Sequence, residues 1–487
     1  MTDMDLGEIE SISAPQLSAS DDLDTSFSWY TEHAALFIST IKWALLGAIA
    51  GLCVGLGTKL FLTALGWATF HAHLLDAGAF HYYFVLPLAL PLCVWLIRTF
   101  APSAKGHGTE AVITAVHTRS GRIDLSVAPV KLLGTVLTLA FGGSVGKEGP
   151  CAQIGAAITS GFADLLRLSD ADRRRLVICG IGAGFAAVFG TPVSGALFGI
   201  EVLYLGRIEY PVLFPCLIAG IMAHLVCGVA PPIPMQHQDL GRLSPAVLVL
   251  LSLLFGVIFG LTARVMIGVL RRTDSALRRF RDYPYAVAAM GGVMLALMYR
   301  VFGEQYAGLG TGVIDDAMNG TAHLALAAFA IKIVTTTITL ETGGSGGIVT
   351  PLFFIGSSLG AALAAHLGLP VGVFAAFGFV AVLAAATNTP IAASVMGIEL
   401  LPAPLGVYAA LCACTAYLIV GHRSVYASQR IGFSKSAGLE VPLGGRIGDV
   451  SRKHLRVRPG TLAARFHNYS TARSKKTKRR TSPPQGK

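Results

Sequence analysis

The chain has 487 residues, of which 53% are hydrophobic and only 13% are charged, against roughly a quarter charged in soluble domains. Such a chain has too little polar surface to cover a water-facing exterior, which excludes a soluble globular protein and favours a polytopic membrane protein. The net charge of +11 lies mostly in loops and in the tail. We interpret it as positive-inside topology rather than as a nucleic-acid surface, so no nucleic-acid partner is expected.

In chain order, an acidic N-terminal segment without Lys or Arg covers residues 1–32. Apolar stretches follow, and a spanning helix needs about 20 such residues. Shorter stretches, interrupted by many of the 56 Gly and 23 Pro, predict broken and re-entrant helices. A basic tail, residues 435–487, is expected to be cytosolic and largely unstructured. The predicted long apolar stretches lie near residues 34–66, 83–97, 210–228, 243–263, 284–299, 322–340 and 404–420.

An internal repeat organises the chain. The glycine-rich loop at 143–150 shares its Gly, Ser and Pro positions with the loop at 344–351. A second match follows downstream, between residues 190–201 and 388–399. Two matches in the same order and at nearly equal offset predict two homologous membrane halves. We place the first half at 33–228 and the second at 229–434.

Each glycine-rich loop turns into an apolar helix at Pro150 or Pro351, and proline suits a first helical turn. A helix N-terminus carries free backbone N–H groups and a partial positive charge. In duplicated transporters, broken helices from both halves point such ends at a substrate near the midplane. The pattern therefore predicts an anion site that needs no buried lysine, which matters because a full charge at the bilayer centre costs about 2.5–3.5 kcal/mol.

Four motifs carry a resemblance to a known family. The sequence G-K-E-G-P at 146–150, followed by Gln153, resembles the G-[RK]-E-G-P motif of the CLC chloride channels and transporters. Residues 347–351 resemble the family's G-x-F-x-P motif with Val349 at the Phe position, residues 105–108 stand where the family has its G-S-G-x-P loop, and residues 422–426 resemble the segment with the pore tyrosine. The chain is identified as a member of the prokaryotic type, without CBS domains because its tail is short.

The resemblance implies an all-α polytopic fold with two inverted-topology halves, in a homodimer with one pore per subunit. It also implies a multi-pass protein of the bacterial inner membrane with both termini cytosolic and lipid around it. The transported ligand would be chloride or a similar small anion, and neither a cofactor nor a metal ion is expected. Voltage-gated chloride channels are among the family's members.

Glu148 is the first candidate for a functional residue. An ionised carboxylate at a helix N-terminus would compete with the transported anion for the same N–H groups, and protonation would release it. It also matches the family's gating glutamate. The resemblance further implies that Lys131 supports the site with positive field, and that the anion is bound by groups of Gly106, His107, Gly108, Gly146, Lys147, Gly149, Gly347, Ile348, Val349 and Tyr426.

Two departures from the family pattern bear on mechanism. His107 stands where most members have serine, which leaves selectivity among chloride, nitrate and other anions open. Val202 stands where proton-coupled members often carry an acid that receives protons from the cytosol. Valine does not relay a proton, so we favour channel-like or weakly proton-coupled conduction, with chloride/proton antiport as the alternative.

Readings from other classes remain. Both glycine-rich loops satisfy G-x-S-x-G, so a membrane-embedded serine hydrolase is a formal alternative. That motif requires a strand before its serine, whereas an apolar, helix-like run precedes Ser144. A structural or receptor role would leave the polar glycine-rich loops without a purpose. We therefore expect a transport protein and not an enzyme.

Overall fold

The computed structural model describes residues 29–78, 80–229, 243–321, 324–450 and 454–465. The expected acidic segment 1–32 lies almost entirely outside the described residues, as does the end of the basic tail. The chain divides into two compact units, residues 1–45 and 46–487. Among the described residues, the first contributes only the beginning of helix α1 (Trp29–His73).

Each half of the chain contains eight described α-helices, in the same order. In the first half, α1 is followed by α2 (Leu86–Phe100), α3 (Thr109–Thr118), α4 (Val127–Ala140), α5 (Glu148–Leu165), α6 (Asp170–Phe189), α7 (Pro192–Glu201) and α8 (Leu213–Cys227). The second half consists of α9 (Pro245–Leu277), α10 (Pro284–Phe302), α11 (Thr311–Asn319), α12 (Ala328–Glu341), α13 (Val349–Leu367), α14 (Val371–Thr387), α15 (Pro390–Leu400) and α16 (Ala403–Ile419). Short 3-10 helices join several of them, at Tyr82–Val85, Pro102–Ala104, Tyr210–Val212, Arg278–Phe280, Glu304–Tyr306 and Ile447–Asp449.

Matching breaks in the two halves have matching causes. Helix α6 ends at Gly190 and α14 ends at Asn388, both in the left-handed conformation, with φ of 67° and 57°. Glycine and asparagine are the residues that favour this helix-ending conformation. Pro192 and Pro390 then begin the next helices, α7 and α15, at the position where a missing N–H is tolerated.

Two glutamates, the buried Glu201 and the partly buried Glu399, show that the halves are related by a two-fold axis. The carboxylate of Glu201, at the end of α7, accepts hydrogen bonds from the N–H groups of Ile391 (3.1 Å) and Ala392 (2.8 Å) at the start of α15. In return, the carboxylate of Glu399 near the end of α15 accepts the N–H groups of Val193 (3.0 Å) and Ser194 (2.8 Å) at the start of α7. Each half therefore caps a helix N-terminus of the other.

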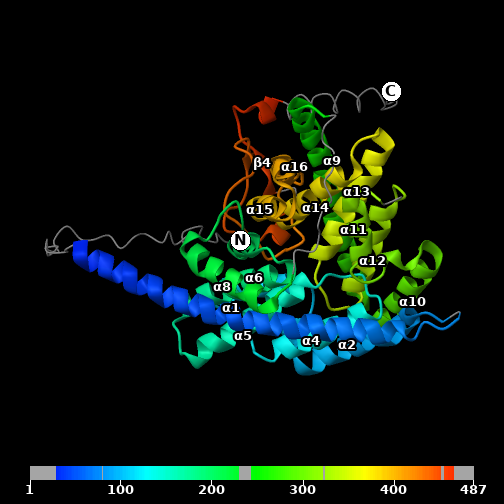
Figure 1. Ribbon diagram of the computed structural model, residues 1–487, viewed down its shortest axis with the longest axis horizontal. Helices are drawn as coiled ribbons and strands as arrows, with labels where there is room; N and C mark the ends of the chain where they lie inside the picture. Colours follow the sequence, from blue (N-terminus) through cyan, green and yellow to red (C-terminus); the bar gives the residue numbers. More distant parts are fainter. Residues whose placement is uncertain (1–28, 79, 230–242, 322–323, 451–453, 466–487) are drawn as a thin grey trace, which may run out of the picture. The chain divides into compact units, whose positions relative to one another are not determined.

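Helices that could cross a membrane surround a core of buried ones. Six described helical segments are long and apolar enough to span a bilayer, among them α9 and α10. In the apolar window of α13, 83% of residues are buried by protein, against 39% in that of α10. Figure 1 shows α13 in the yellow part of the chain, with α12 and α14 near it. The expected all-α polytopic fold is confirmed.

One expected span is wrong in its length. The stretch 322–340 was expected to be long enough to cross a bilayer, but α12 begins only at Ala328 and has 14 residues. The chain turns sharply at Gly343, where φ is 119°. A glycine-rich turn thus ends the helix and opens the second repeat loop.

The beginning of the tail is folded, which corrects the expectation of an unstructured end. Strand β2 (Arg430–Ile431) pairs in parallel with β1 (Tyr204–Leu205), and β3 (Leu439–Glu440) pairs antiparallel with β4 (Arg456–Val457). Ile447 is completely buried in a small cluster with Leu205 and Ile431. Although the tail is mostly polar, these few apolar side chains are enough to hold its beginning against the segment after α7.

The reciprocal caps generate a prediction about stability. Replacement of Glu201 by Gln removes the charge from two hydrogen bonds, so we expect the free energy of unfolding to fall by about 1–3 kcal/mol. Thermal unfolding of the purified protein in detergent measures this loss. Glu304→Gln, at an exposed position, is the control and should leave the midpoint unchanged. An equal midpoint for the Glu201→Gln protein and the unsubstituted one would contradict the capping role.

Candidate functional site

The two glycine-rich loops meet at backbone level in the interior. The N–H of Gly146 donates to the carbonyl of Gly347, and the N–H of Gly347 donates to the carbonyl of Gly146, both at 2.6 Å. This antiparallel contact joins residues 201 positions apart in the sequence. It brings the N-termini of α5 and α13 together, as the repeat predicted for an anion site.

Glycine is required at this contact for steric reasons. A Cβ atom on Gly347 would lie 2.7 Å from the backbone nitrogen of Gly149 and 3.2 Å from its Cα. Backbone atoms do not yield as the tip of a flexible side chain does. Any larger residue at Gly347 would therefore separate the two helix N-termini.

Serine and threonine side chains support the loops symmetrically. The N–H of Ser144 donates to Thr339 Oγ1, and the N–H of Ser345 donates to Thr138 Oγ1, both at 3.0 Å. The Ser144 hydroxyl is hydrogen bonded to Thr336 Oγ1 at 3.0 Å. Helix α4, and not a strand, precedes Ser144. The G-x-S-x-G match thus reflects a structural serine in each repeat, and the hydrolase reading loses its support.

Glu148 lies where the two loops join. It is the first residue of α5 and is only 1% exposed. Its carboxylate accepts a hydrogen bond from the backbone N–H of Thr350 at 3.1 Å and another from the Thr350 hydroxyl. Thr350 is in the first turn of α13. A carboxylate from one half is therefore held by donors at the helix N-terminus of the other half.

Thr350 escaped the sequence analysis, which expected only backbone donors from the second loop. A threonine in the first turn of an apolar helix is common and gives no signal by itself. One difference between the repeats was visible in the sequence, since Gly149 stands in the first repeat at the position that corresponds to Thr350. A polar side chain that only one repeat carries breaks the symmetry of the site.

Two buried polar atoms, in Tyr426 and His107, have no hydrogen-bond partner among the described residues. Tyr426 is completely buried, and its hydroxyl has no hydrogen-bond partner among the described residues. The same holds for Nδ1 of His107. The Tyr426 segment is held by its backbone, since the N–H of Val425 donates to the carbonyl of Ala386 (2.9 Å) and that of Tyr426 to Ser424 Oγ (3.0 Å). Buried polar groups are usually satisfied, so these two atoms are available to a ligand or water.

The other expected anion-binding residues fall into two places. Lys147 is the residue before α5, and Ile348 the residue before α13, whose first residue is Val349. Both apolar residues are buried. Gly106 and Gly108 flank His107 in the turn before α3 and have positive φ. The backbone of Gly108 lies directly against that of Gly149, so this turn adjoins the Glu148 loop.

Lys131 is completely buried and contacts the loop before α3. Its Nζ donates to the carbonyls of Gly106 (2.6 Å) and Ala104 (3.2 Å). The second half contains the same arrangement, which the sequence analysis missed. Nζ of Lys332 donates to the carbonyls of Gly308 (2.9 Å) and Tyr306 (3.1 Å). Both lysines stand twelve residues before the first glycine of their repeat loop, so self-comparison of the sequence could have found the pair.

Val202 is completely buried directly after α7. Its carbonyl accepts a hydrogen bond from Nε2 of Gln429 at 2.7 Å. The position where a proton relay would need a titratable side chain therefore has an apolar one, which is enclosed by protein.

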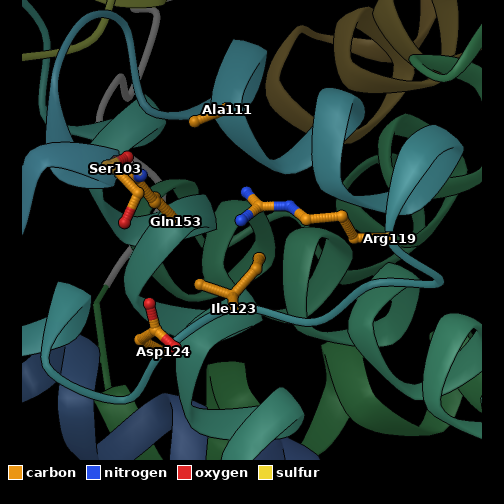
Figure 2. A pocket seen from close by; sticks show the side chains of 6 residues that line it. All are labelled: Ser103, Ala111, Arg119, Ile123, Asp124 and Gln153. Carbon is orange, nitrogen blue, oxygen red and sulfur yellow. Dashed lines mark hydrogen bonds between the residues drawn. The ribbon is translucent and has the colours of Figure 1, made fainter.

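Gln153, which follows the G-K-E-G-P motif, connects α5 to the turn before α3. Its Nε2 donates to the carbonyl of Ser103 at 2.9 Å. Figure 2 shows both residues at a small cavity into which the Arg119 side chain extends. The cavity volume is about 10 Å³, near the minimum for one water molecule. It is too small for a transport route, and we interpret Gln153 as a residue that positions the loop.

The fold and the site define a class of protein, a duplicated membrane transporter or channel whose two halves bring helix N-termini together. Residues 88–421 match the family described as voltage gated chloride channel. The chain belongs to this family, the CLC proteins.

Individual relatives agree with this assignment. A "Chloride/fluoride channel protein" of Pseudomonas syringae pv. tomato is 35% identical over 426 residues, covering 85% of this chain and 91% of the relative. An "H(+)/Cl(-) exchange transporter ClcA" of Salmonella paratyphi B is 30% identical, covering 73% of this chain and 80% of the relative. The solved structure of a CLC-type fluoride/proton antiporter superposes with a TM-score of 0.73 at 29% identity, over 80% of this chain and 98% of that one.

The contact between Glu148 and Thr350 generates a prediction. A hydrogen bond to a charged group contributes about 1.5–3 kcal/mol, which corresponds to roughly a tenfold to hundredfold change in an equilibrium. Thr350→Val removes the hydroxyl while nearly keeping its shape, so we expect the carboxylate to leave the site more often. Anion flux through reconstituted protein at neutral pH should rise about tenfold.

Thr350→Ser, which keeps the hydroxyl, is the matched control for this measurement. It should retain the flux of the unsubstituted protein. If Thr350→Val and Thr350→Ser conduct equally, the hydroxyl does not hold the carboxylate.

Proposed function

We propose that the protein passes a small halide across the membrane and that Glu148 is its gate. The observation that carries the proposal is the position of the Glu148 carboxylate, which occupies donors at the point where two helix N-termini meet. An ionised carboxylate and a transported anion compete for these donors. Protonation of Glu148 removes its charge and frees them. Chloride and fluoride are both candidate substrates.

Fluoride fits the donor set of the site. The Thr350 hydroxyl lies at the Glu148 carboxylate, and the Tyr426 hydroxyl and a nitrogen of His107 are buried without partners among the described residues. A compact anion with strongly held water gives up that water only for several good hydrogen-bond donors. Two similar proteins, one named a chloride/fluoride channel protein and one described as a fluoride/proton antiporter, support the same choice. We therefore propose fluoride as a substrate beside chloride.

Transport is proposed to be channel-like or only weakly coupled to protons. The enclosed Val202 supports this, because no acid stands at that position to take protons from the cytosol. Antiport is the second candidate, since two solved structures with this fold are described as proton antiporters. The two modes differ in one measurable respect: only a coupled transporter moves an anion against its gradient.

The assembly and orientation are part of the proposal. A homodimer in the bacterial inner membrane, with one pore per subunit and both termini cytosolic, follows from family membership and from the positive-inside rule. The Arg-rich end of α9 and the 3-10 helix Arg278–Phe280 then lie on the cytosolic side. Lys131 and Lys332 are proposed to add positive field while they hold their loops.

Flux measurements on purified protein in liposomes test the function. We expect chloride and fluoride efflux down their gradients that increases on acidification, because protonated Glu148 no longer competes. In a Glu148→Gln protein the flux should be high and should not depend on pH. Ion-selective electrodes record both halides in one preparation.

Three results of this experiment would count against the proposal. Absence of halide flux would exclude the function. A Glu148→Gln protein with the pH dependence of the unsubstituted protein would exclude the gate. Uphill halide movement driven by a proton gradient alone would replace the channel-like mode with antiport.

A further inference from the structure

A second, larger cavity lies beside the site, and His107 is the residue that the cavity and the site share. Its volume is about 100 Å³, enough for several water molecules. Two parts of its lining stand out: His107, whose Nδ1 atom is buried, and two carboxylates, Glu341 and Asp274. The remaining lining residues are Ile267, Leu270, Arg271, Ser424, Val425 and Ala427.

The cavity lies on the side that we assign to the cytosol. Asp274 and Arg271 are in the last turns of α9, and Nε and Nη2 of Arg278, just after it, donate to Asp274 at 3.2 and 2.7 Å. Arg278, Arg279 and Arg281 form a basic cluster there, and such clusters remain on the cytosolic side of a membrane. The cavity therefore connects the cytosolic end of α9 with the turn that contains His107.

We propose that Glu341 receives protons from the cytosol and passes them through this cavity to Glu148, in place of the acid that Val202 lacks. The inference deepens the proposed function and rests on Glu148 being the gate. Glu341 is the last residue of α12, close to the second repeat loop. Its side chain is partly buried and lines the cavity, and an ionisable residue inside a membrane protein is by default a candidate for function.

The steps of the transfer are plain acid–base exchanges. A proton from cytosolic water binds a carboxylate oxygen of Glu341. It then moves along water in the cavity to His107, whose buried Nδ1 has no partner among the described residues. A neutral imidazole accepts a proton at one nitrogen and releases one from the other. The His107 turn lies against Gly149, and the Tyr426 hydroxyl, a second buried polar atom without a partner among the described residues, interacts with the charge of Glu148. The released proton therefore reaches the Glu148 carboxylate by way of these groups or of water.

The charges around Glu341 fit a group that gains and loses a proton. From α9, Asp274 and Arg271 face the cavity, and Nη2 of Arg271 is buried without a hydrogen-bond partner among the described residues. From the turn before α3, Lys105 acts on Glu341 through its charge, and His107 lines the cavity. Helix α10 packs against the same end of α12 with Gly291 facing Thr342. One neighbouring carboxylate and two cations thus surround Glu341, and among the described residues none of them forms a salt bridge with it that would fix it as charged.

Vesicles of known orientation test the proposal. Inside-out and right-side-out membrane vesicles expose opposite faces of the protein, so the pH of each face can be lowered separately by about two units. In the unsubstituted protein we expect halide flux to rise with acid on either face. In Glu341→Gln the response to cytosolic acid should fall about tenfold, as for loss of a positioned proton-transfer group, while the response to external acid persists.

Three further variants make the result decisive. Glu341→Asp keeps a carboxylate and should restore most of the cytosolic response. Glu304→Gln is the matched control at an exposed position of the second half and should keep both responses. Glu148→Gln should lose both. The retained response to external acid also shows that the Glu341→Gln protein is folded.

Several outcomes would overturn the proposal. An unchanged cytosolic response in Glu341→Gln, with both responses lost in Glu148→Gln, removes Glu341 and leaves the gate intact. An equal fall of flux in Glu341→Gln at every pH shows that the cavity admits anions rather than protons. An unsubstituted protein that ignores cytosolic acid excludes the route, and a Glu148→Gln protein that keeps both responses removes the gate together with the route.

Discussion

The reciprocal hydrogen bonds between Gly146 and Gly347 are the contact on which the rest of the site depends. Within a bilayer, backbone that leaves helical geometry must find partners in protein. Here the two non-helical loops satisfy each other, and the absence of side chains lets them approach closely enough to do so. The free N–H groups of α5 and α13 are thereby left facing one small region, which then attracts negative charge.

The same two-fold relation explains the support around the site. Ser144 and Ser345 exchange hydrogen bonds with threonines of the opposite half, and Glu201 and Glu399 cap helices of the opposite half. Lys131 and Lys332 each hold the turn before a short helix. The residues proposed to carry the function are ones that differ between the two halves. Glu148, Thr350 and His107 have no chemical counterpart in the other repeat, and it is these residues that make one direction of the site different from the other.

Much of this arrangement could be predicted from the sequence, because repeats and glycine-proline breaks are local patterns. The loops at 143–150 and 344–351 and the paired segments ending at Glu201 and Glu399 were all visible as matches. Contacts that depend on tertiary position could not be read in this way. Thr350 resembles any first-turn threonine until α13 is placed against α5. Residues 435–450 gave no sign of folding, since their few apolar residues are scattered among Gly and polar residues and the burial of Ile447 depends on β1, more than 200 residues earlier.

Glu341 shows how a missing residue can be replaced in a different place. The sequence indicated that Val202 breaks a known proton path, which favoured conduction without strong coupling. A path, however, needs only a titratable group, water and geometry, and these need not come from the same helix. Helix α12 supplies a carboxylate at its last residue, just before the glycine turn that ends the helix. Channel-like flux and control by cytosolic protons are therefore compatible, since a gate that is protonated from one side sets how often the pore opens without fixing how many anions pass.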